Sequence, residues 1–258
     1  MSYLARIIDR KRRQVRESAA NIQLASLQTE ATVCTTDVVG ALRHPGTLRF
    51  IAEHKRKSPS RGFIRKDSDP ADIGRQYEVA GAAAMSVLTD EMDFAGSPGD
   101  LRHARDAVSI PILCKDFIVS PVQVFQARAW GADLVLLIVA ALSRAELQAL
   151  HQLATGLGMT PLVEVHDAHE LDVAVSVGAQ VIGVNNRDLH TFTVDLAVSE
   201  ALAPRFPEPV VRVSESGIDS VEDLKRLQQA GYHAVLMGER LMRAPHPGRA
   251  LSELREAL

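Results

Sequence analysis

Short, strongly apolar segments recur along the chain, and several of them end in a residue that can do chemistry. Five of these segments run into the following polar groups: Glu53-His54-Lys55, Lys115, Glu164, Asn185-Asn186-Arg187 and Glu215. Burying an unpaired charge is costly, so a charged side chain at the end of a buried strand is expected where a cleft opens. The pattern therefore predicts one cleft assembled from the ends of several strands.

Glycines recur at a nearly constant interval and mark a repeat. Gly81, Gly131, Gly178 and Gly231 are 50, 47 and 53 residues apart, and each follows a helical pattern and precedes an apolar run. A glycine just past a helix supplies the left-handed backbone conformation that ends the helix. Four further apolar runs begin near residues 50, 111, 161 and 209. Eight strands are therefore expected.

The segments between these runs carry helix start signals. Ser143, Asp167 and Ser220 are each followed three places on by an acidic residue, the pattern of a capping box. Helices that alternate with continuous apolar strands indicate a parallel sheet buried on both faces. No Gly-x-Gly-x-x-Gly fingerprint supports an open dinucleotide-binding sheet. We expect an α/β fold in which residues 1–258 form a single (β/α)8 TIM barrel domain, with residues 1–47 as an N-terminal helical extension.

The start of this extension has the pattern of an amphipathic helix. Leu4, Ile7 and Ile8 are spaced for one helix face, and residues 10–16 form a basic run. Charge runs are usually solvated faces, so we expect a basic surface exposed to water rather than a nucleic-acid contact. A helix placed here could also help to close the mouth of a substrate site.

Composition narrows the function classes. The chain has 258 residues and a net charge of −3, which argues against a nucleic-acid binder that relies on bulk charge. Cys34 and Cys114 have no metal-ligand spacing, and two cysteines of this kind suit a reducing compartment. No apolar run reaches the roughly 18 residues of a membrane span, and no secretory signal is visible. The expectation is a cytoplasmic enzyme that binds neither membrane nor nucleic acid.

Strand alternation assigns a direction to each candidate side chain. It places the following residues on the inner face of the barrel: Glu53, Lys55, Lys115, Glu164, Asn185, Arg187 and Glu215. Active sites of these barrels lie at the C-terminal ends of the strands, where all of these residues fall. The alternative is that the charges form only structural ion pairs that plug the barrel end.

The same alternation turns other polar residues outward. Cys114 is expected as a small core residue, and His54 as a structural histidine rather than a catalyst. Arg212 also faces the helices, and its sequence position offers no reason for a charge there. His166 and His169 have no evident third ligand, so a metal site is not expected.

Two glycines follow the last two expected strands. Ser216-Gly217 and Gly238-Glu239 occupy the positions where backbone N–H groups of these barrels bind phosphate. Lys55 and Ser58 add a cation and a hydroxyl group after the first strand, which adjoins the last strand on closure. Residues 57–65 combine serine, glycine and basic residues, so we expect a mobile loop that closes over substrate.

Seven motifs spread over the chain resemble those of indole-3-glycerol phosphate synthase, an enzyme family of tryptophan biosynthesis. They are IAEHKRKSPS (51–60), SVLTD (86–90), PILCKDF (111–117), LVEVH (162–166), GVNNRDL (183–189), SESGI (214–218) and MGERLM (237–242). His54 stands where the family more often has an aliphatic residue. Because this side chain is expected to face outward, the difference leaves the chemistry intact.

The resemblance implies a carboxy-lyase that acts on 1-(2-carboxyphenylamino)-1-deoxyribulose 5-phosphate. Ring closure would release carbon dioxide and water, without a cofactor or a metal. Lys115 would be the general acid, and Glu164 would assist the dehydration. The remaining implied roles are orientation and charge balance by Glu53 and Glu215, a hydrogen bond from Asn185, binding of the substrate carboxylate by Arg187 and Lys55, and phosphate contacts from Ser216, Gly217, Gly238 and Glu239. The sequence leaves open which of Lys115, Lys55 and Glu164 acts in each proton transfer.

Two other functions remain as alternatives. In a Schiff-base aldolase, Lys115 would attack a carbonyl group covalently. In a non-catalytic sugar-phosphate-binding barrel, the pocket would serve as a sensor. The mixture of one lysine and several carboxylates argues against a sensor, and trapping with borohydride would separate an aldolase from a ring-closing enzyme.

Overall fold

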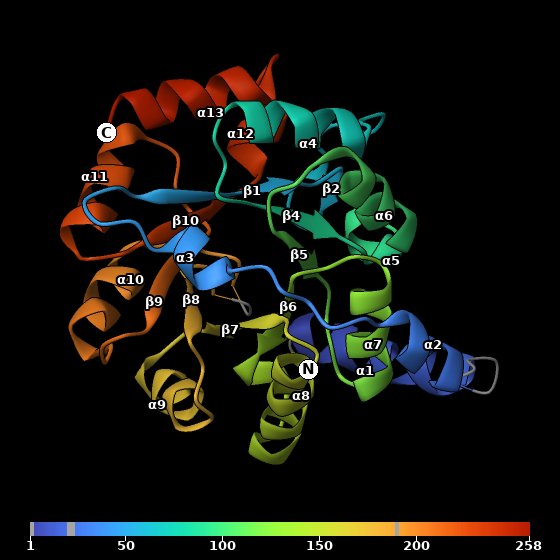
Figure 1. The fold of residues 1–258 in the computed structure, drawn as a ribbon. Coiled ribbons are helices and arrows are strands. Elements are labelled where there is room, and N and C mark those ends of the chain that lie inside the picture. Colours follow the sequence, from blue (N-terminus) through green and yellow to red (C-terminus); the bar gives the residue numbers. More distant parts are fainter. Residues whose placement is uncertain (1–2, 20–23, 189–190) are drawn as a thin grey trace.

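Eight parallel strands form a closed barrel in the computed structural model, which describes residues 3–19, 24–188 and 191–258 (Figure 1). The barrel strands are β1 (Arg49–His54), β4 (Ala84–Leu88), β5 (Ile112–Lys115), β6 (Leu134–Ile138), β7 (Thr160–Val165), β8 (Val181–Asn185), β9 (Val211–Glu215) and β10 (Ala234–Met237). Each strand pairs with its neighbours in chain order, and β1 closes the barrel by pairing with both β4 and β10. The predicted TIM barrel is confirmed.

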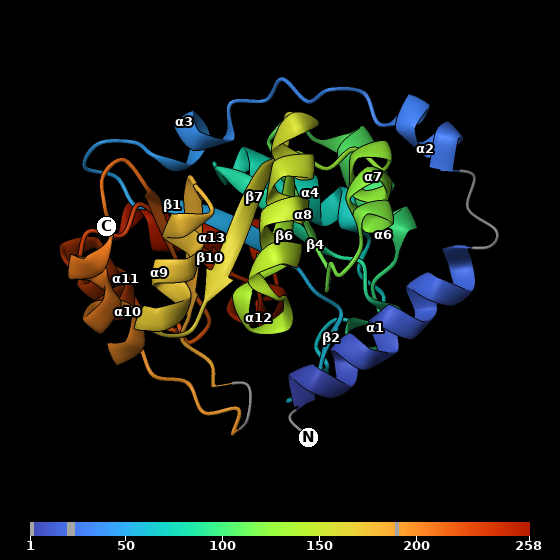
Figure 2. The same cartoon turned by 90° about the horizontal axis from the view of Figure 1, so that it is seen from below.

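Helices surround the strands on the outside (Figures 1 and 2). They are α4 (Pro70–Val79), α6 (Pro98–Ala107), α7 (Pro121–Ala129), α8 (Arg144–Gly156), α9 (Ala168–Ser176), α10 (Ala197–Leu202), α11 (Val221–Gln229) and α13 (Pro247–Glu256). The predicted caps form: Ser143 and Ser220 make complete capping boxes, and Asp167 accepts a hydrogen bond from the Glu170 N–H. None of the helices described here is long and apolar enough to cross a membrane.

Shorter elements lie in the loops. They are α5 (Glu91–Phe94), α12 (Glu239–Arg243), the two 3-10 turns η1 (Val139–Ala141) and η2 (Ala203–Arg205), and a hairpin of β2 (Lys57–Ser58) and β3 (Gly62–Phe63). In the hairpin, Ser58 pairs with Gly62 and Lys57 with Phe63. The loop expected to be mobile therefore contains a short antiparallel ladder. Its movement stays a prediction.

Apolar residues form two layers, one inside the barrel and one between strands and helices. Ile51, Leu113, Leu162, Val181 and Val213 belong to the inner layer. The outer layer includes Phe50, Cys114, Val163, Ile182 and Val235. Each of these outer residues is adjacent in sequence to an inward-facing position, so the predicted alternation is confirmed. It points every charged candidate at a strand end toward the barrel axis.

The N-terminal extension forms α1 (Tyr3–Ala19), α2 (Leu24–Glu30) and α3 (Val38–Leu42). Figure 2 shows α1 and α3 at opposite ends of the barrel. Leu4 and Ile8 of α1 and Val38 and Leu42 of α3 pack into the inner apolar layer from these two ends. The expected amphipathic helix is therefore present, and it covers the end of the barrel where the strands terminate.

The prediction that the basic residues of α1 are exposed to water is wrong for two of them. Lys11 Nζ lies 2.8 Å from Asp90 Oδ2 and 2.6 Å from Asp116 Oδ1, and its side chain is almost entirely buried. Arg10 also pairs with Asp90, at 2.8 Å, and with Asp93, at 2.6 Å. These carboxylates lie in the loops after β4 and β5, so α1 is held to the barrel by ion pairs as well as apolar contacts.

The structure accounts for the outward-facing polar residues. Arg212 Nη2 lies 3.1 Å from Glu208 Oε1, and the guanidinium carbon lies 5.6 Å from the centre of the Phe206 ring. His54 is buried, and its Nε2 is 2.9 Å from Ser68 Oγ. Burial, with a smaller contribution from the charge of Arg56, lowers the pKa of His54 to about 4. His54 is thus a neutral structural residue at physiological pH.

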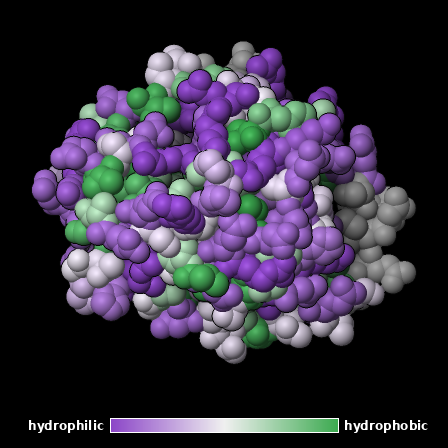
Figure 3. Space-filling model, turned by 90° about the horizontal axis from the view of Figure 1, so that it is seen from above, coloured by the Kyte–Doolittle hydropathy of each residue, from purple (hydrophilic) through white to green (hydrophobic). Residues whose placement is uncertain are grey.

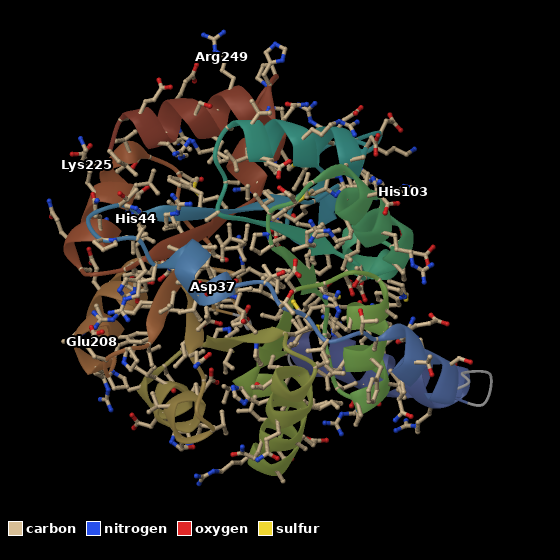
Figure 4. All side chains as sticks on the ribbon, viewed as in Figure 1. Asp37, His44, His103, Glu208, Lys225 and Arg249 are labelled. Carbon is tan, nitrogen blue, oxygen red and sulfur yellow. The ribbon has the colours of Figure 1, made fainter. Side chains whose placement is uncertain are left out.

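The face of the molecule seen from above is mostly polar (Figure 3). Figure 3 shows mainly hydrophilic residues on the face seen from above, with apolar residues in small separate groups. His103, Lys225 and Arg249 point away from the barrel on the outer helices (Figure 4). Isolated apolar residues on such a surface need no partner to explain them.

Candidate active site

A pocket with about 900 Å³ of empty space opens at the C-terminal ends of the strands. Of the twelve residues predicted to form the site, these eight line it: Glu53, Ser58, Lys115, Glu164, Asn185, Arg187, Ser216 and Glu239. The other four adjoin it. Lys55 and Glu215 make ion pairs with pocket residues, Gly217 follows Ser216, and Gly238 precedes Glu239.

Lys115 lies at the centre of the charged part of the pocket. Its Nζ is 3.3 Å from Glu164 Oε2 and 3.2 Å from Glu215 Oε2. Burial alone would lower the pKa of this amine. The charges of Glu215, Glu164 and Glu53 more than offset burial, so the pKa of Lys115 is raised. Lys115 is therefore an ammonium group at neutral pH and can donate a proton.

The two carboxylates beside Lys115 have different environments. Glu164 Oε1 accepts a hydrogen bond of 3.2 Å from Asn185 Nδ2. Burial would raise the pKa of Glu164, but Lys115, His166 and the Asn185 hydrogen bond together lower it. Burial raises the pKa of Glu215 to about 7, with Lys115 opposing and Glu164 and Glu53 adding to the rise. The pair thus combines an ionised carboxylate with one that holds a proton up to neutrality.

Two glycines make room for these glutamates. A Cβ atom at residue 183 would clash with Glu215 Oε1, and a Cβ atom at residue 238 would clash with Glu53 Oε2. Glu53 Oε2 is also 2.6 Å from Nζ of Lys55, which follows the end of β1. Gly238 was predicted only for the approach of a phosphate group. The structure adds that it accommodates the side chain of Glu53.

The turn after β9 has an unusual backbone. Ser216 and Gly217 have φ angles of 67° and 74°, and a left-handed conformation is uncommon for a residue other than glycine. Buried Asn186 supports this turn, because its Nδ2 donates to the carbonyl oxygens of Glu215 (2.9 Å) and Ser216 (3.1 Å). Asn186 also accepts a hydrogen bond of 2.7 Å from Ser199 Oγ. The sequence analysis assigned Asn186 no role. Strand alternation turns Asn186 outward, opposite to Asn185, and this could have identified it as a supporting residue outside the pocket.

Sequence reasoning also missed the apolar wall of the pocket. Side chains from α1, α5, β4, β6 and the loops after β5 and β8 contribute to it: Tyr3, Leu4, Ile7, Leu88, Phe94, Phe117, Leu136, Ile138 and Phe192. The rings of Tyr3 and Phe192 meet edge to face, with centroids 5.2 Å apart. Phe117 could have been predicted as a pocket residue, because it lies two residues after Lys115 and strand alternation gives both side chains the same direction. The expected contribution of the N-terminal helix to the mouth of the site is present.

Two polar groups remain at the rim of this wall. Arg187 is half-buried, and its Nη1 donates to the carbonyl oxygen of Phe192 at 3.3 Å. Ser58 Oγ is buried and has no hydrogen-bond partner within the described part of the chain. Within the same residues, no group of three or more His, Cys, Asp or Glu side chains is arranged to hold a metal ion. Leu189, the last residue of one sequence motif, lies outside the described residues.

The fold and the pocket define a class of protein. A (β/α)8 barrel with a buried lysine between carboxylates, beside an apolar wall, is the arrangement of an enzyme that uses acid–base chemistry on a partly apolar substrate. Comparison with known proteins makes this specific. The family model of indole-3-glycerol phosphate synthase matches residues 4–254.

Named relatives agree with this match. The chain is 50% identical over 210 residues to indole-3-glycerol phosphate synthase of Carboxydothermus hydrogenoformans, covering 81% of this chain and 80% of the relative. It is 48% identical over 253 residues to the protein of the same name from Pelodictyon phaeoclathratiforme, covering 96% and 98%. The chain belongs to the indole-3-glycerol phosphate synthase family, and the resemblance noted in its motifs is confirmed.

Similarity to solved structures extends to more distant barrels. Thiamine phosphate pyrophosphorylase from Pyrococcus furiosus superposes with a TM-score of 0.62, covering 86% of this chain and 97% of that one. The sequence identity is 15%, so this match carries the fold alone.

Proposed function

We propose that this chain closes the pyrrole ring of 1-(2-carboxyphenylamino)-1-deoxyribulose 5-phosphate with loss of carbon dioxide and water, forming indole-3-glycerol phosphate. The observation that carries the proposal is the position of Lys115, an ammonium group held by Glu164 and Glu215 at the base of an apolar pocket. Membership of the family supports the same reaction. Tryptophan biosynthesis is the corresponding pathway.

The pocket suits the parts of this substrate. The apolar wall, with Phe117 and Phe192, would receive the carboxyphenyl ring. Arg187 and Lys55 would bind its carboxylate, which must stay ionised to leave as carbon dioxide. The phosphate group would lie at the other side of the pocket, against the backbone N–H groups of Ser216–Gly217 and Gly238–Glu239 and the hydroxyl of Ser58.

The charge states suit the proton transfers. Lys115, held as an ammonium, would protonate the carbonyl oxygen while the ring carbon attacks it. After carbon dioxide has left, the hydroxyl group departs as water and a C–H proton is lost to a base. Glu164 is ionised and would assist this dehydration. Asn185 would hold Glu164 and the reacting region through its amide, Glu53 and Glu215 would orient these groups, and Glu53 would balance their charge.

Charge balance requires one proton from solvent in each turnover. A carboxylate anion leaves as neutral carbon dioxide, and a hydroxyl group leaves as neutral water. Two protons are therefore consumed, at the carbonyl oxygen and at the leaving hydroxyl, while one is released from carbon. Side chains of the pocket would deliver and accept these protons, and solvent would restore the one that is consumed.

A Schiff-base aldolase fits the site less well. Attack on a carbonyl carbon requires a neutral amine, and buried lysines that act in this way have lowered pKa values. The pKa of Lys115 is instead raised by three carboxylates. No separate observation favours a sensor.

The direct test is to incubate the purified protein with the carboxyphenylamino substrate and to follow the appearance of indole fluorescence. Sodium borohydride added during turnover tests for an imine. We expect fluorescent product and no reduced adduct at Lys115. A borohydride-trapped adduct, or binding of the substrate without turnover, would refute the proposal in favour of an aldolase or a sensor.

A further inference from the structure

Lys115 forms ion pairs with two buried carboxylates at almost equal distances. Lys115 Nζ is 3.3 Å from Glu164 and 3.2 Å from Glu215. Lys115 therefore does not determine which carboxylate is ionised and which holds a proton. The proposed reaction needs a defined base, so something else must distinguish the two.

The distinction lies in the second oxygen of each carboxylate. Glu164 Oε1 accepts a hydrogen bond of 3.2 Å from Asn185 Nδ2, and His166 Nε2 lies 3.5 Å away without a hydrogen bond to it. Glu215 Oε1 is buried and has no hydrogen-bond partner among the described residues. A hydrogen-bond donor and an imidazole that can carry charge thus lie beside this oxygen of Glu164, and among the described residues Glu215 Oε1 has neither. Of these two, His166 alone can carry a charge.

Glu170 holds the imidazole of His166 in place. His166 Nδ1 lies 2.9 Å from Glu170 Oε2, and the His166 backbone N–H donates to the same oxygen at 2.8 Å. His166 follows β7 directly and lies two residues after Glu164. A carboxylate on one ring nitrogen favours the protonated ring, which then places a positive charge 3.5 Å from Glu164 Oε1.

His166 does not line the substrate pocket. It lies in a second pocket with about 1280 Å³ of empty space, which shares Leu4, Asn185 and Arg187 with the first but not Glu164 or Lys115. His166 is therefore not among the residues that a ligand in the first pocket would contact directly. The charged groups around the ring come from several elements: Glu164, Glu170, Glu215, Asp167, Arg187, Asp188 and Asp195. Burial would lower the pKa of His166, but the hydrogen bond to Glu170 and the charges of Glu164, Glu170 and Glu215 raise it.

We propose that His166, oriented by Glu170, is a positioning residue that keeps Glu164 as the ionised partner of Lys115 and leaves the proton on Glu215. The consequence for turnover rests on the proposed function, in which Glu164 acts as a base. The charge assignment itself does not, because it belongs to the ligand-free protein. Glu215 is then the carboxylic acid of the site, close to the ammonium that gives up its proton.

The charge assignment can be measured without substrate. Protein labelled with ¹³C at the glutamate carboxyl carbons is titrated by NMR, and the Glu164 and Glu215 signals are assigned from Glu164→Gln and Glu215→Gln. In the wild type, we expect Glu164 to titrate at lower pH than Glu215. In His166→Asn, the midpoint of Glu164 should rise and that of Glu215 should fall, by about one pH unit in total, as expected for loss of one charge at this distance.

Two further variants sharpen the test. Glu170→Gln should move both midpoints in the same directions, because it releases the imidazole without altering His166. His169→Asn is the matched control, since it removes an exposed histidine three residues away and should change neither midpoint. If His166→Asn fails to fold by circular dichroism, Glu170→Gln alone decides the matter. Unchanged midpoints in a folded His166→Asn or Glu170→Gln protein overturn the proposal, as does a wild-type Glu164 that titrates above Glu215.

Kinetics then tests the consequence. The acid limb of the kcat/KM profile reports protonation of the free-enzyme base. We expect this limb to move to higher pH by about one unit in His166→Asn, and His169→Asn to follow the wild type. A loss of activity that is uniform in pH would instead indicate a purely structural role and would refute this part. If the wild type forms no product at all, the proposed reaction fails, while the NMR midpoints still decide the charge assignment.

Discussion

Glu53 Oε2 at the end of β1 and Lys55 Nζ, one residue beyond the strand, lie 2.6 Å from each other beside the substrate pocket. In this close ion pair, the positive charge of Lys55 is compensated by one carboxylate. Lys115 instead contacts two carboxylates at longer distances. Lys55 therefore suits the binding of an anionic group that can take over from Glu53. Lys115 suits proton transfer. The different roles of the two lysines thus follow from their different ion-pair partners, because the two side chains have the same chemistry.

Removal of the central acid or base should lower the rate of chemistry. We expect Lys115→Ala and Glu164→Gln each to reduce kcat by at least ~10²-fold, the usual scale for the loss of general acid–base catalysis. Both variants should be checked for folding, because Lys115 offsets buried negative charge. If Lys115→Ala folds and retains nearly wild-type kcat, Lys115 is not the acid, and the role passes to Lys55.

Replacement of Arg187 should act mainly on substrate binding. A guanidinium that binds the substrate carboxylate is engaged before the transition state, so its loss weakens ground-state binding. We expect Arg187→Ala to raise KM substantially and to change kcat less than Lys115→Ala does. The two constants are obtained from the same fluorescence assay. A fall in kcat with an unchanged KM would show that Arg187 acts in the chemical step instead.

Arg61, at the tip of the β2–β3 hairpin, should be the site of trypsin cleavage in the free protein. Its side chain is 62% exposed and lies 3.4 Å from Glu239, whereas Arg65 donates to the carbonyl oxygens of Met242 and Ala244. A substrate analogue should protect Arg61 by closing the hairpin over the pocket. Mass spectrometry of the fragments identifies the cut. Equal cleavage with and without the analogue would refute the proposal that the hairpin acts as a lid. Cleavage at exposed Arg249 serves as the ligand-independent reference.

Phosphate should stabilise the folded protein by binding at the turns after β9 and β10. At ten times its Kd, a ligand adds about 1.4 kcal/mol, or roughly 3–6 °C in Tm for a protein of this size. The increase should saturate at millimolar phosphate, in contrast to the gradual stabilisation by excluded salts. Differential scanning fluorimetry at constant ionic strength measures it. A Tm that changes neither with phosphate nor with a substrate analogue contradicts the site.

Glu215 should make the folded protein less stable as pH rises toward neutrality. Its pKa is raised from an ordinary 4.5 to about 7, so the folded state holds a proton that the unfolded chain has lost between these values. The stabilising contribution is complete below pH 4.5 and is lost as pH rises through 7. Glu215→Gln cannot lose this proton. Urea unfolding at pH 5 and pH 8 should show that the variant loses less stability over this interval than the wild type, and parallel losses would contradict the raised pKa.

The barrel was predictable because its information is local. Buried strands such as β6 and β10 are continuous apolar runs, and alternation alone turns Lys115 and Glu164 to the same interior. The location of the site was predictable from the same two properties, the apolar strand runs and the alternation of side chains along them. A charge is tolerated at the end of a buried strand only where a pocket receives it.

The parts that were missed depend on contacts between distant segments. The ion pairs of Lys11 join α1 to Asp90 and Asp116, about eighty and a hundred residues away, and no local pattern specifies them. The different environments of Glu164 and Glu215 likewise depend on which neighbours reach each oxygen. The roles assigned to the predicted site residues stay predictions.

The pairing of β1 with β10 has a consequence for how the protein is made. During synthesis β1 emerges early, but its second partner, Ala234–Met237, is near the end of the chain. Until that segment leaves the ribosome, β1 and β9 each have an unpaired edge of backbone N–H and C=O groups. Such edges are templates for pairing with other chains. A ribosome that stalls before residue 234 would therefore release an open sheet prone to aggregation, and not merely a barrel that lacks one strand.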